Sequence, residues 1–194
     1  MPSQPPQCIL IAGPNGAGKS TIASALLPDT VTFVNADEIA KTLPGYPSPG
    51  VEVQAGRLLL QRLDELAWQR ADMTVETTLA GRTLANRIRQ FQAEGYHFHL
   101  IFVWIPDADL SVARVALRVQ SGGHHVPEET IRRRYRAGLV NFFGVYRPLA
   151  DTWGVYRNIQ IGKPELIAEG SAGGSEQVYL PDVWDTMKEM DSDE

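Results

Sequence analysis

The chain has 194 residues, of which 43% are hydrophobic and 21% charged, a balance that excludes a disordered protein. This length suits one well-packed α/β domain and is short for two. Residues 181–194 hold six acids and one lysine and so account for the whole net charge of −5, which leaves the body neutral and disfavours a nucleic-acid partner. We expect this acidic end to be a solvated tail, with partner binding as the alternative.

The composition also bears on the compartment. The one cysteine, Cys8, cannot form an internal disulfide and fits a reducing environment. The first seven residues contain no basic side chain, and only five apolar or small residues follow before a glycine-rich loop. This pattern predicts neither a signal peptide nor a membrane span, so we expect a cytoplasmic protein with no membrane partner.

The most informative stretch is residues 13–20, which match the phosphate-binding pattern G-x-x-x-x-G-K-[ST] between a predicted strand at 8–12 and a predicted helix at 21–27. Its backbone N–H groups can surround a β-phosphate, Lys19 can reach the β- and γ-phosphates, and the Ser20 hydroxyl can complete a magnesium shell. The alternative is a glycine-rich turn that binds nothing. We therefore predict Mg²⁺ and ATP or GTP, bound through Gly13, Pro14, Asn15, Gly16, Ala17, Gly18, Lys19, Ser20 and Thr21.

A second strand is predicted at 31–34, after a turn at 28–30, and it leads into Asp37. Ligands of open parallel sheets lie beyond the carboxyl ends of the strands, which places Asp37 on the same edge as the phosphate-binding loop. The carboxylate could take a proton from a substrate hydroxyl or act through magnesium. Alternatively, it could cap a helix that begins at Glu38.

The next segments predict a loop at 42–50 and an amphipathic helix at 51–71. Tyr46, within the loop, could face a ligand or cover the core. A third strand at 73–79 carries Glu76 and Thr77 near its end, followed by a helix at 83–93. A buried carboxylate needs a partner, so Glu76 is either paired with an arginine or used for substrate or metal.

A long apolar strand is predicted at 96–105, with His97 and His99 on one face. Their apolar neighbours favour structural histidines over a metal site. Asp107 and Asp109 are expected to begin the following helix.

Residues 114–136 carry six arginines against two glutamates and comprise two predicted helices joined by a glycine-rich link. Such a segment is typical of a mobile lid whose guanidinium groups offset charge on a transferring phosphoryl group. The alternative for any one arginine is a solvated helix face, and at least one of the three at 132–134 must point away from the site. The arginines are Arg114, Arg118, Arg132, Arg133, Arg134 and Arg136.

Toward the end of the chain, residues 139–149 predict short helical pieces and 153–159 predict the last strand. Residues 166–183 show little periodicity and fit either a hairpin or a loose excursion. We therefore expect one domain over 1–180, with the lid at about 114–136 and the tail at 181–194.

Taken together, four segments in this order resemble the zeta-toxin family of P-loop kinases in its short, single-domain form. They are the phosphate-binding loop through Thr21, the strand end at 35–39, Glu76-Thr77-Thr78-Leu79, and the segment from Gly122 to Tyr135.

The resemblance implies a three-layer α/β/α P-loop fold like that of nucleoside-monophosphate kinases, and transfer of phosphate from ATP or GTP to a hydroxyl of UDP-N-acetylglucosamine. It implies a catalytic role for Lys19 and Asp37, with Asp37 as general base. Glu76, Thr77 and His124 are expected at the substrate, and Arg118 and Arg134 at the phosphates. An antitoxin protein is a candidate partner.

Our leading hypothesis is thus a magnesium-dependent kinase that acts on a small-molecule hydroxyl. Two alternatives remain: an ATPase or nucleotide switch that acts through a partner, and a polynucleotide 5′-hydroxyl kinase.

Overall fold

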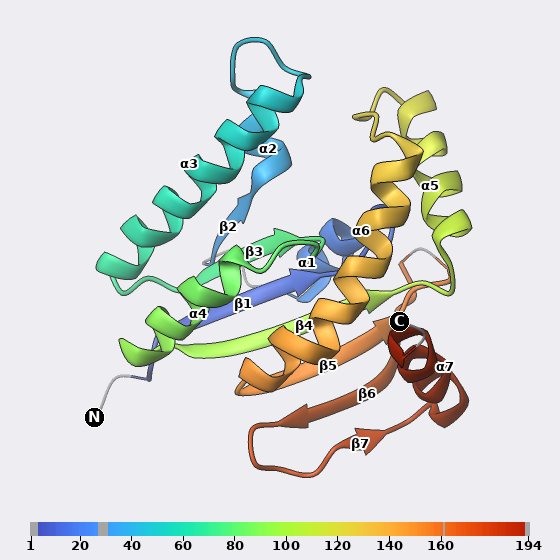
Figure 1. The fold of residues 1–194 in the computed structure, drawn as a ribbon. Helices are drawn as coiled ribbons and strands as arrows, with labels where there is room; N and C mark the ends of the chain where they lie inside the picture. Colours follow the sequence, from blue (N-terminus) through green and yellow to red (C-terminus); the bar gives the residue numbers. More distant parts are fainter. Residues whose placement is uncertain (1–3, 27–30, 161, 193–194) are drawn as a thin grey trace.

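The computed structural model describes residues 4–26, 31–160 and 162–192, and the predicted turn at 28–30 lies outside them. Within these ranges, seven strands form one sheet in the order β2-β3-β1-β4-β5-β6-β7 (Figure 1). The first five in this order are parallel, whereas β6 pairs antiparallel with β5 and β7 pairs antiparallel with β6. The strands are β1 (Gln7–Ala12), β2 (Thr32–Asn35), β3 (Met73–Thr77), β4 (His97–Trp104), β5 (Thr152–Arg157), β6 (Glu165–Ser171) and β7 (Gln177–Val178).

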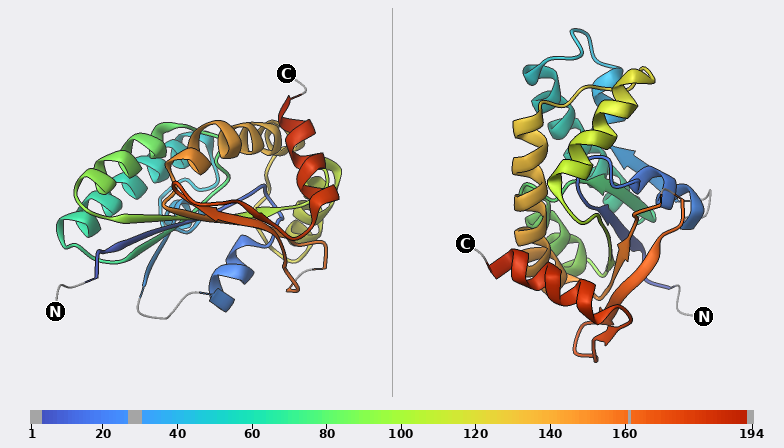
Figure 2. Two further views of the ribbon diagram at one scale, coloured as in Figure 1. Left: turned by 90° about the horizontal axis from the view of Figure 1, so that it is seen from below. Right: turned by 90° about the vertical axis from the view of Figure 1, so that its right-hand side faces the viewer.

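Helices cover both faces of the sheet, as the two views of Figure 2 show. On one face lie α3, α4, α6 and α7, and on the other lies α1. The helices are α1 (Lys19–Leu26), α2 (Ala36–Lys41), α3 (Pro49–Trp68), α4 (Thr83–Ala93), α5 (Ala108–Gln120), α6 (Glu128–Asn141) and α7 (Pro181–Ser192), with η1 (Phe142–Tyr146) and η2 (Arg147–Leu149) after α6. The predicted three-layer α/β/α P-loop fold with a mostly parallel sheet is confirmed.

The core lies mainly between the sheet and the larger helical layer, because the central strands are apolar on both faces. On this side Leu10, Val75 and Phe98 of the strands pack with Leu63 of α3 and Phe91 of α4. A second cluster, on α1 and the strands beneath it, contains Ile11, Ile22 and Val103. The helices thereby fix the carboxyl ends of β1, β2 and β3, where the sequence places its functional side chains.

The prediction of a solvated acidic tail is wrong for the described part of this segment. Residues 181–192 form α7, in which Trp184 is 1% exposed and Met187 is fully buried. The Trp184 ring stacks on Trp153 of β5 at 5.7 Å, and its Nε1 donates to Glu176. The acids of α7 therefore occupy the outer face of an amphipathic helix that caps the end of the sheet.

The structure also corrects the end of the sheet. Residues 153–159 were expected to supply the last strand, but β6 and β7 follow β5 and form the hairpin that was one of the two alternatives for 166–183. Elsewhere the predicted elements lie close to the observed ones, and α4 has the predicted bounds.

Two side chains outside the site, those of Cys8 and His99, contribute to the packing of the sheet. Cys8 is buried, and this burial raises the pKa of its thiol to about 12. His99 contacts Thr152 and Gln7 as a structural histidine would, and burial lowers its pKa. No helix in the described part of the chain is long and apolar enough to cross a membrane.

Candidate active site

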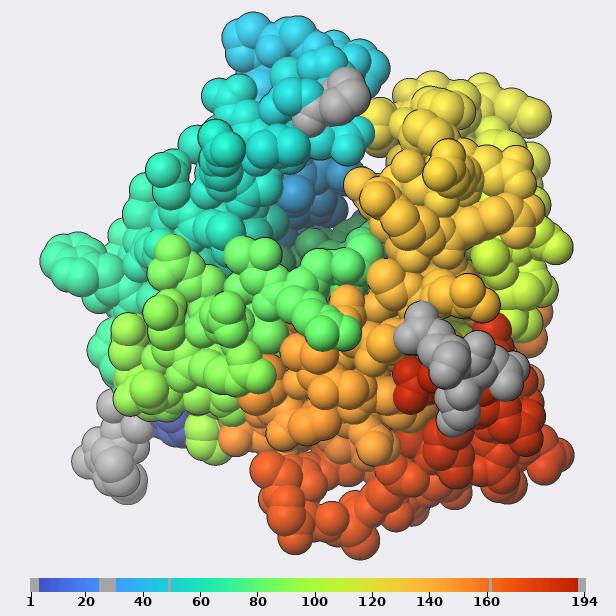
Figure 3. All heavy atoms as spheres, in the orientation of Figure 1, coloured from blue at the N-terminus to red at the C-terminus, as the bar shows by residue number. Residues whose placement is uncertain are grey.

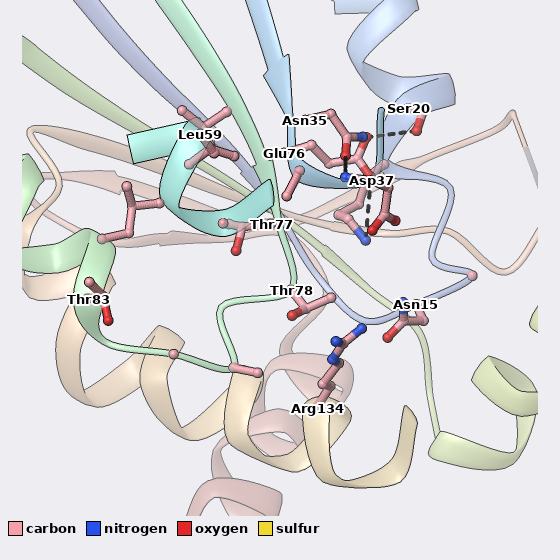
Figure 4. Close-up of a pocket in the computed structure, with 18 of the residues that line it drawn as sticks. Asn15, Ser20, Asn35, Asp37, Leu59, Glu76, Thr77, Thr78, Thr83 and Arg134 are labelled. Atoms are coloured by element: carbon pink, nitrogen blue, oxygen red, sulfur yellow. Dashed lines mark hydrogen bonds and ion pairs between the residues drawn. The ribbon is translucent and has the colours of Figure 1, made fainter. Parts of the chain in front are cut away.

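A cavity of about 690 Å³ lies at the carboxyl ends of β1, β2 and β3, between the phosphate-binding loop, α3, α4 and α6. Figure 3 shows the hollow between α3 and α6. We call the end at the phosphate-binding loop the donor half, and the end at α3, α4 and the loop 78–82 the acceptor half. Asn15, Ser20 and Asp37 line the donor half (Figure 4), and so does Lys19.

Three residues of the phosphate-binding loop, Gly13, Gly16 and Gly18, have positive φ angles that only glycine adopts without strain. Gly13, with φ of +139°, lies so close to β4 that an added Cβ would be 2.2 Å from the carbonyl oxygen of Val103. Gly18 has φ of +85°, and its Cβ would lie 2.4 Å from Nδ2 of Asn158. These glycines let the loop bend tightly over the start of α1, where backbone N–H groups and the helix N-terminus attract phosphate.

Two buried side chains from distant segments hold this loop. Asn158, after β5, donates from Nδ2 to the carbonyl oxygen of Ala17 at 2.7 Å. The Ser111 hydroxyl of α5 donates to the carbonyl oxygen of Asn15. Sequence reasoning missed both residues, although Asn158 follows an apolar strand as Asp37 does and could have been found by the same rule.

Lys19 is buried and lies at the centre of the donor half. Its ammonium donates to the carbonyl oxygen of Pro14 at 3.0 Å and lies 3.8 Å from Oε1 of Glu76. Burial lowers the pKa of Lys19, the carboxylates of Glu76 and Asp37 oppose this shift, and Arg118 and Arg134 add to it. Bound phosphates would supply the missing negative charge at this position.

In the part of the chain that the structure describes, Glu76 pairs with the phosphate-binding loop and with no arginine. Its Oε2 accepts a hydrogen bond from the Ser20 hydroxyl at 2.7 Å. Mg²⁺ prefers oxygen ligands, and the donor half offers the hydroxyl of Ser20 with the carboxylates of Glu76 and Asp37. These residues fit a magnesium site with Ser20 as the direct protein ligand.

Asp37 is not the helix cap that the alternative interpretation required. The helix begins at Ala36, and the capping side chain is Asn35, whose Oδ1 accepts from the backbone N–H of Asp37 at 2.8 Å. The Asp37 side chain is thus left free of the capping role, and it lines the cavity beside Ser20. Figure 4 shows Asp37, in the first turn of α2, close to Glu76 of β3.

The arginine-rich segment divides between the cavity and the outer surface. Arg114, Arg118 and Arg134 line the cavity, as the lid interpretation predicts for part of the segment. Arg132 is instead paired with Asp109 and Glu128. Arg133 lines a groove on the outer side of α6, so the consecutive arginines point in different directions, as expected for a helix.

His124 does not line the cavity. Its ring lies 5.2 Å from that of Tyr46, and its Nε2 is 3.7 Å from Oε1 of Glu52. Glu52 also lies 3.7 Å from the guanidinium of Arg134. Tyr46 therefore packs against the lid, and these residues join α3 to the α5–α6 segment near the mouth of the cleft.

The acceptor half is apolar with a few hydroxyl groups. Thr77, Thr78 and Thr83 supply the hydroxyls, and the exposed Arg57 of α3 adds a positive charge. The apolar lining residues are Val53, Leu59, Leu60 and Leu84. This half can hold the body of an acceptor whose hydroxyl points toward Asp37.

The loop 78–82 is held from behind by α6 and η1. Asn141, 4% exposed, donates to the carbonyl oxygen of Leu79 at 2.7 Å and accepts from Arg82 at 2.8 Å. The Tyr146 hydroxyl donates to the carbonyl oxygen of Gly81 at 2.7 Å, and burial raises its pKa to about 12, so it remains a donor at neutral pH. Nothing in the sequence predicts these contacts.

Known proteins resemble the chain in sequence and in fold. The Zeta toxin family pattern matches residues 1–158. An uncharacterised protein of Haemophilus influenzae is 28% identical over 129 residues, which are 66% of this chain and 92% of that protein.

Two solved structures resemble the fold. The crystal structure of AvrRxo1-ORF1:-ORF2 with ATP matches with a TM-score of 0.75 and 18% identity, over 95% of this chain and 64% of that chain. The structure from the PezAT toxin-antitoxin system of Streptococcus pneumoniae matches with a TM-score of 0.68 and 16% identity, over 99% of this chain and 80% of that chain. The family match covers most of the chain, and the fold agrees with it. The chain therefore belongs to the Zeta toxin family of P-loop kinases.

Proposed function

We propose that the chain transfers the γ-phosphoryl group of ATP or GTP to a hydroxyl of a small molecule. The observation that carries the proposal is that Lys19, Asp37 and Arg134 line one cavity, from three different elements. Phosphoryl transfer requires a cation that binds the phosphates, a carboxylate that is not used to cap a helix, and an arginine from the lid.

In this mechanism the phosphate-binding loop fixes the nucleotide, and Lys19 compensates the charge of the β- and γ-phosphates. Asp37 orients the acceptor hydroxyl in line with the γ-phosphorus and accepts its proton as the new O–P bond forms. Arg118 and Arg134 stabilise the charge on the phosphoryl oxygens. Mg²⁺, when bound, would neutralise charge on the β- and γ-phosphates, and Ser20 would be its protein ligand.

The acceptor is the least constrained part of the proposal. A cavity of about 690 Å³ is large enough for a nucleotide-sized molecule, and β3 contributes Glu76 to its donor half and Thr77 to its acceptor half. The family relationship supports a sugar nucleotide such as UDP-N-acetylglucosamine. The toxin-antitoxin neighbour from Streptococcus pneumoniae supports an antitoxin as a candidate partner. The single cysteine, Cys8, supports the reducing cytoplasm as the location.

The decisive experiment is an acceptor screen with Asp37→Asn as the test variant. The wild-type chain should add one phosphoryl group to an acceptor in a pool of nucleotide sugars. Mass spectrometry would detect the product by a gain of about 80 Da, the mass of one phosphoryl group. Asp37→Asn should lower transfer by at least ~10²-fold, because it removes the base, while ATP affinity changes little.

Asp109→Asn is the matched control, since Asp109 is exposed on α5 and outside the cavity, and it should transfer as the wild type does. Unchanged transfer by Asp37→Asn would refute the base assignment. Release of free phosphate with every acceptor would favour an ATPase. Transfer to a 5′-hydroxyl oligonucleotide in the same screen would favour a polynucleotide kinase.

A further inference from the structure

Asn15 is a buried polar residue of the phosphate-binding loop whose side chain has no protein partner among the described residues. It is 5% exposed, and its Oδ1 is buried without a hydrogen bond. A buried amide that lacks a partner costs free energy, on the order of 1–3 kcal/mol. Since Asn15 also lines the cavity, the missing partner is best explained as a ligand.

The position of Asn15 identifies which part of a nucleotide it would meet. The Lys19 ammonium, which serves the β- and γ-phosphates of a bound nucleotide, contacts the carbonyl oxygen of Pro14, the residue before Asn15. Arg134 and Asp37 line the same cavity. Figure 4 shows the Asn15 and Arg134 side chains pointing into it from opposite elements, the loop and α6. The side chain of Asn15 is therefore at the end of the loop where phosphate is transferred.

The backbone of Asn15 has a separate role from its side chain. Its carbonyl oxygen accepts from the Ser111 hydroxyl, so the loop is held at this residue without the help of the carboxamide. A side chain that is buried, unpartnered and not needed to anchor the loop is available for a ligand. The atom without a partner is the oxygen, and a phosphate oxygen cannot donate to it. A half-turn about the Cβ–Cγ bond exchanges the two ends of the carboxamide and brings the NH₂ group, which can donate to a phosphate, into that position.

We propose that the carboxamide of Asn15 donates a hydrogen bond to the γ-phosphate and thereby distinguishes a nucleoside triphosphate from a diphosphate. The inference rests on the proposed function, because it requires that the cavity hold the nucleotide. The amide contacts a phosphoryl oxygen and takes no proton. It orients the γ-phosphoryl group between Lys19 and Arg134, on the side from which the acceptor hydroxyl approaches.

The test compares the affinities for ADP and for the β,γ-imido analogue of ATP, both with Mg²⁺, by isothermal titration calorimetry. Asn15→Ala should weaken binding of the analogue about tenfold or more and binding of ADP less than about threefold, because only the analogue has the lost partner. Asn15→Asp keeps the size of the side chain and places a negative charge beside the γ-phosphate. It should weaken binding of the analogue more than Asn15→Ala does, while binding of ADP changes less.

Ser111→Ala is the matched control, because it removes the anchor of the same residue and leaves the carboxamide in place. Ser111→Ala should weaken the binding of both nucleotides by the same factor. Circular dichroism and thermal unfolding identify a variant that does not fold, and the isosteric Asn15→Asp then carries the comparison.

The possible outcomes separate this inference from the proposed function. Equal losses for the two nucleotides in both Asn15 variants, or no loss, would overturn the role in γ-phosphate binding and leave the kinase proposal standing. A selective loss in a chain that transfers phosphate to no acceptor would support the inference and count against the kinase. A wild-type chain that binds neither nucleotide would overturn both.

Discussion

The two halves of the cleft are built by different means. In the donor half the polar groups are buried, with Lys19 and Asn15 7% and 5% exposed, and they are held by fully buried residues such as Ser111 and Asn158. In the acceptor half the lining is apolar side chains and threonines, and its one arginine from α3, Arg57, is exposed. Backbone geometry therefore sets the donor half, whereas side chains set the acceptor half.

This difference has a functional meaning. The polyphosphate of a nucleotide is constant in shape and charge, so a rigid backbone cradle suits it. An acceptor differs from one kinase to another, and its recognition depends on pocket shape and a few polar groups. Helix α6 connects the halves, because Arg134 faces the donor half while Asn141 holds the acceptor loop.

The largest contrast should come from adding one methyl group to each half. Gly13→Ala places a Cβ 2.2 Å from a backbone oxygen of β4 in a residue with φ of +139°, so the loop or the strand must shift. We expect the free energy of unfolding to fall by about 3 kcal/mol, and nucleotide binding to be lost. Urea denaturation and calorimetry measure these two quantities.

Gly81→Ala is the matched change in the acceptor half. Its added Cβ would meet no atom within 4 Å, and the residue has no positive φ, so we expect stability to stay within about 0.5 kcal/mol of the wild type. Equal stability of Gly13→Ala and Gly81→Ala would show that the donor half is no more rigid than the acceptor half. That result would contradict the difference proposed between the two halves.

A smaller effect is expected from the support of the acceptor loop. Asn141→Ala removes the donor to Leu79 and the acceptor for Arg82, and it leaves a buried carbonyl without a partner. We expect a loss of about 2 kcal/mol in the free energy of unfolding, with ADP affinity within about twofold of the wild type. Urea denaturation and calorimetry again give both values.

The control for Asn141→Ala is Asn86→Ala, since Asn86 is exposed on α4 and bonds only to Arg89 in the described part of the chain. Asn86→Ala should change neither the free energy of unfolding nor the ADP affinity. A large loss of ADP affinity in Asn141→Ala would mean that α6 transmits the state of the acceptor loop to the donor half, and the halves could not be treated as separate.

The donor half was predictable because its signals are local in sequence. Residues 13–20 form a contiguous pattern, and the rule that ligands lie at strand ends placed Asp37 and Glu76 on the same edge. Pairing of β1 with β3 and of β3 with β2 brings these strand ends together as expected. The sequence could not show that Glu76 bonds to Ser20, because this contact spans 56 residues.

The hydrogen bonds that hold the loops of both halves were not predictable either, because they too join residues far apart in the sequence. Asn158 reaches Ala17 across 141 positions, and Asn141 reaches Leu79 across 62. Only the place of Asn158 after an apolar strand could have marked it, and no local pattern distinguishes Asn141 from an exposed asparagine. By contrast, Trp184 and Met187 of α7 were visible at helical spacing, and the acidic charge around them led to the wrong prediction of a tail.

The smallest expected effect concerns the mouth of the cleft, where the walls meet through side chains alone. Glu52 is 45% exposed and lies 3.7 Å from both His124 and Arg134, distances too long for strong hydrogen bonds. We expect Glu52→Gln to change the free energy of unfolding by less than about 0.5 kcal/mol, as is usual for exposed ion pairs. Urea denaturation is precise enough to test this when it is compared with Glu65→Gln, which removes another exposed partner of an arginine on α3.

Two contacts determine how the lid can move. The contact of Glu52 with the lid at the mouth of the cleft is weak, and the hydrogen bond of Asn141 to the acceptor loop is firm. If Glu52→Gln is as stable as expected, the α5–α6 segment is joined to α3 too loosely to hold the cleft shut. Opening and closing would then leave Asn141 and the loop 78–82 in place, so the acceptor half would keep its shape while nucleotide enters. A loss of 2 kcal/mol or more would instead make Glu52 a structural latch, and the two halves would be coupled at the mouth as firmly as at the base.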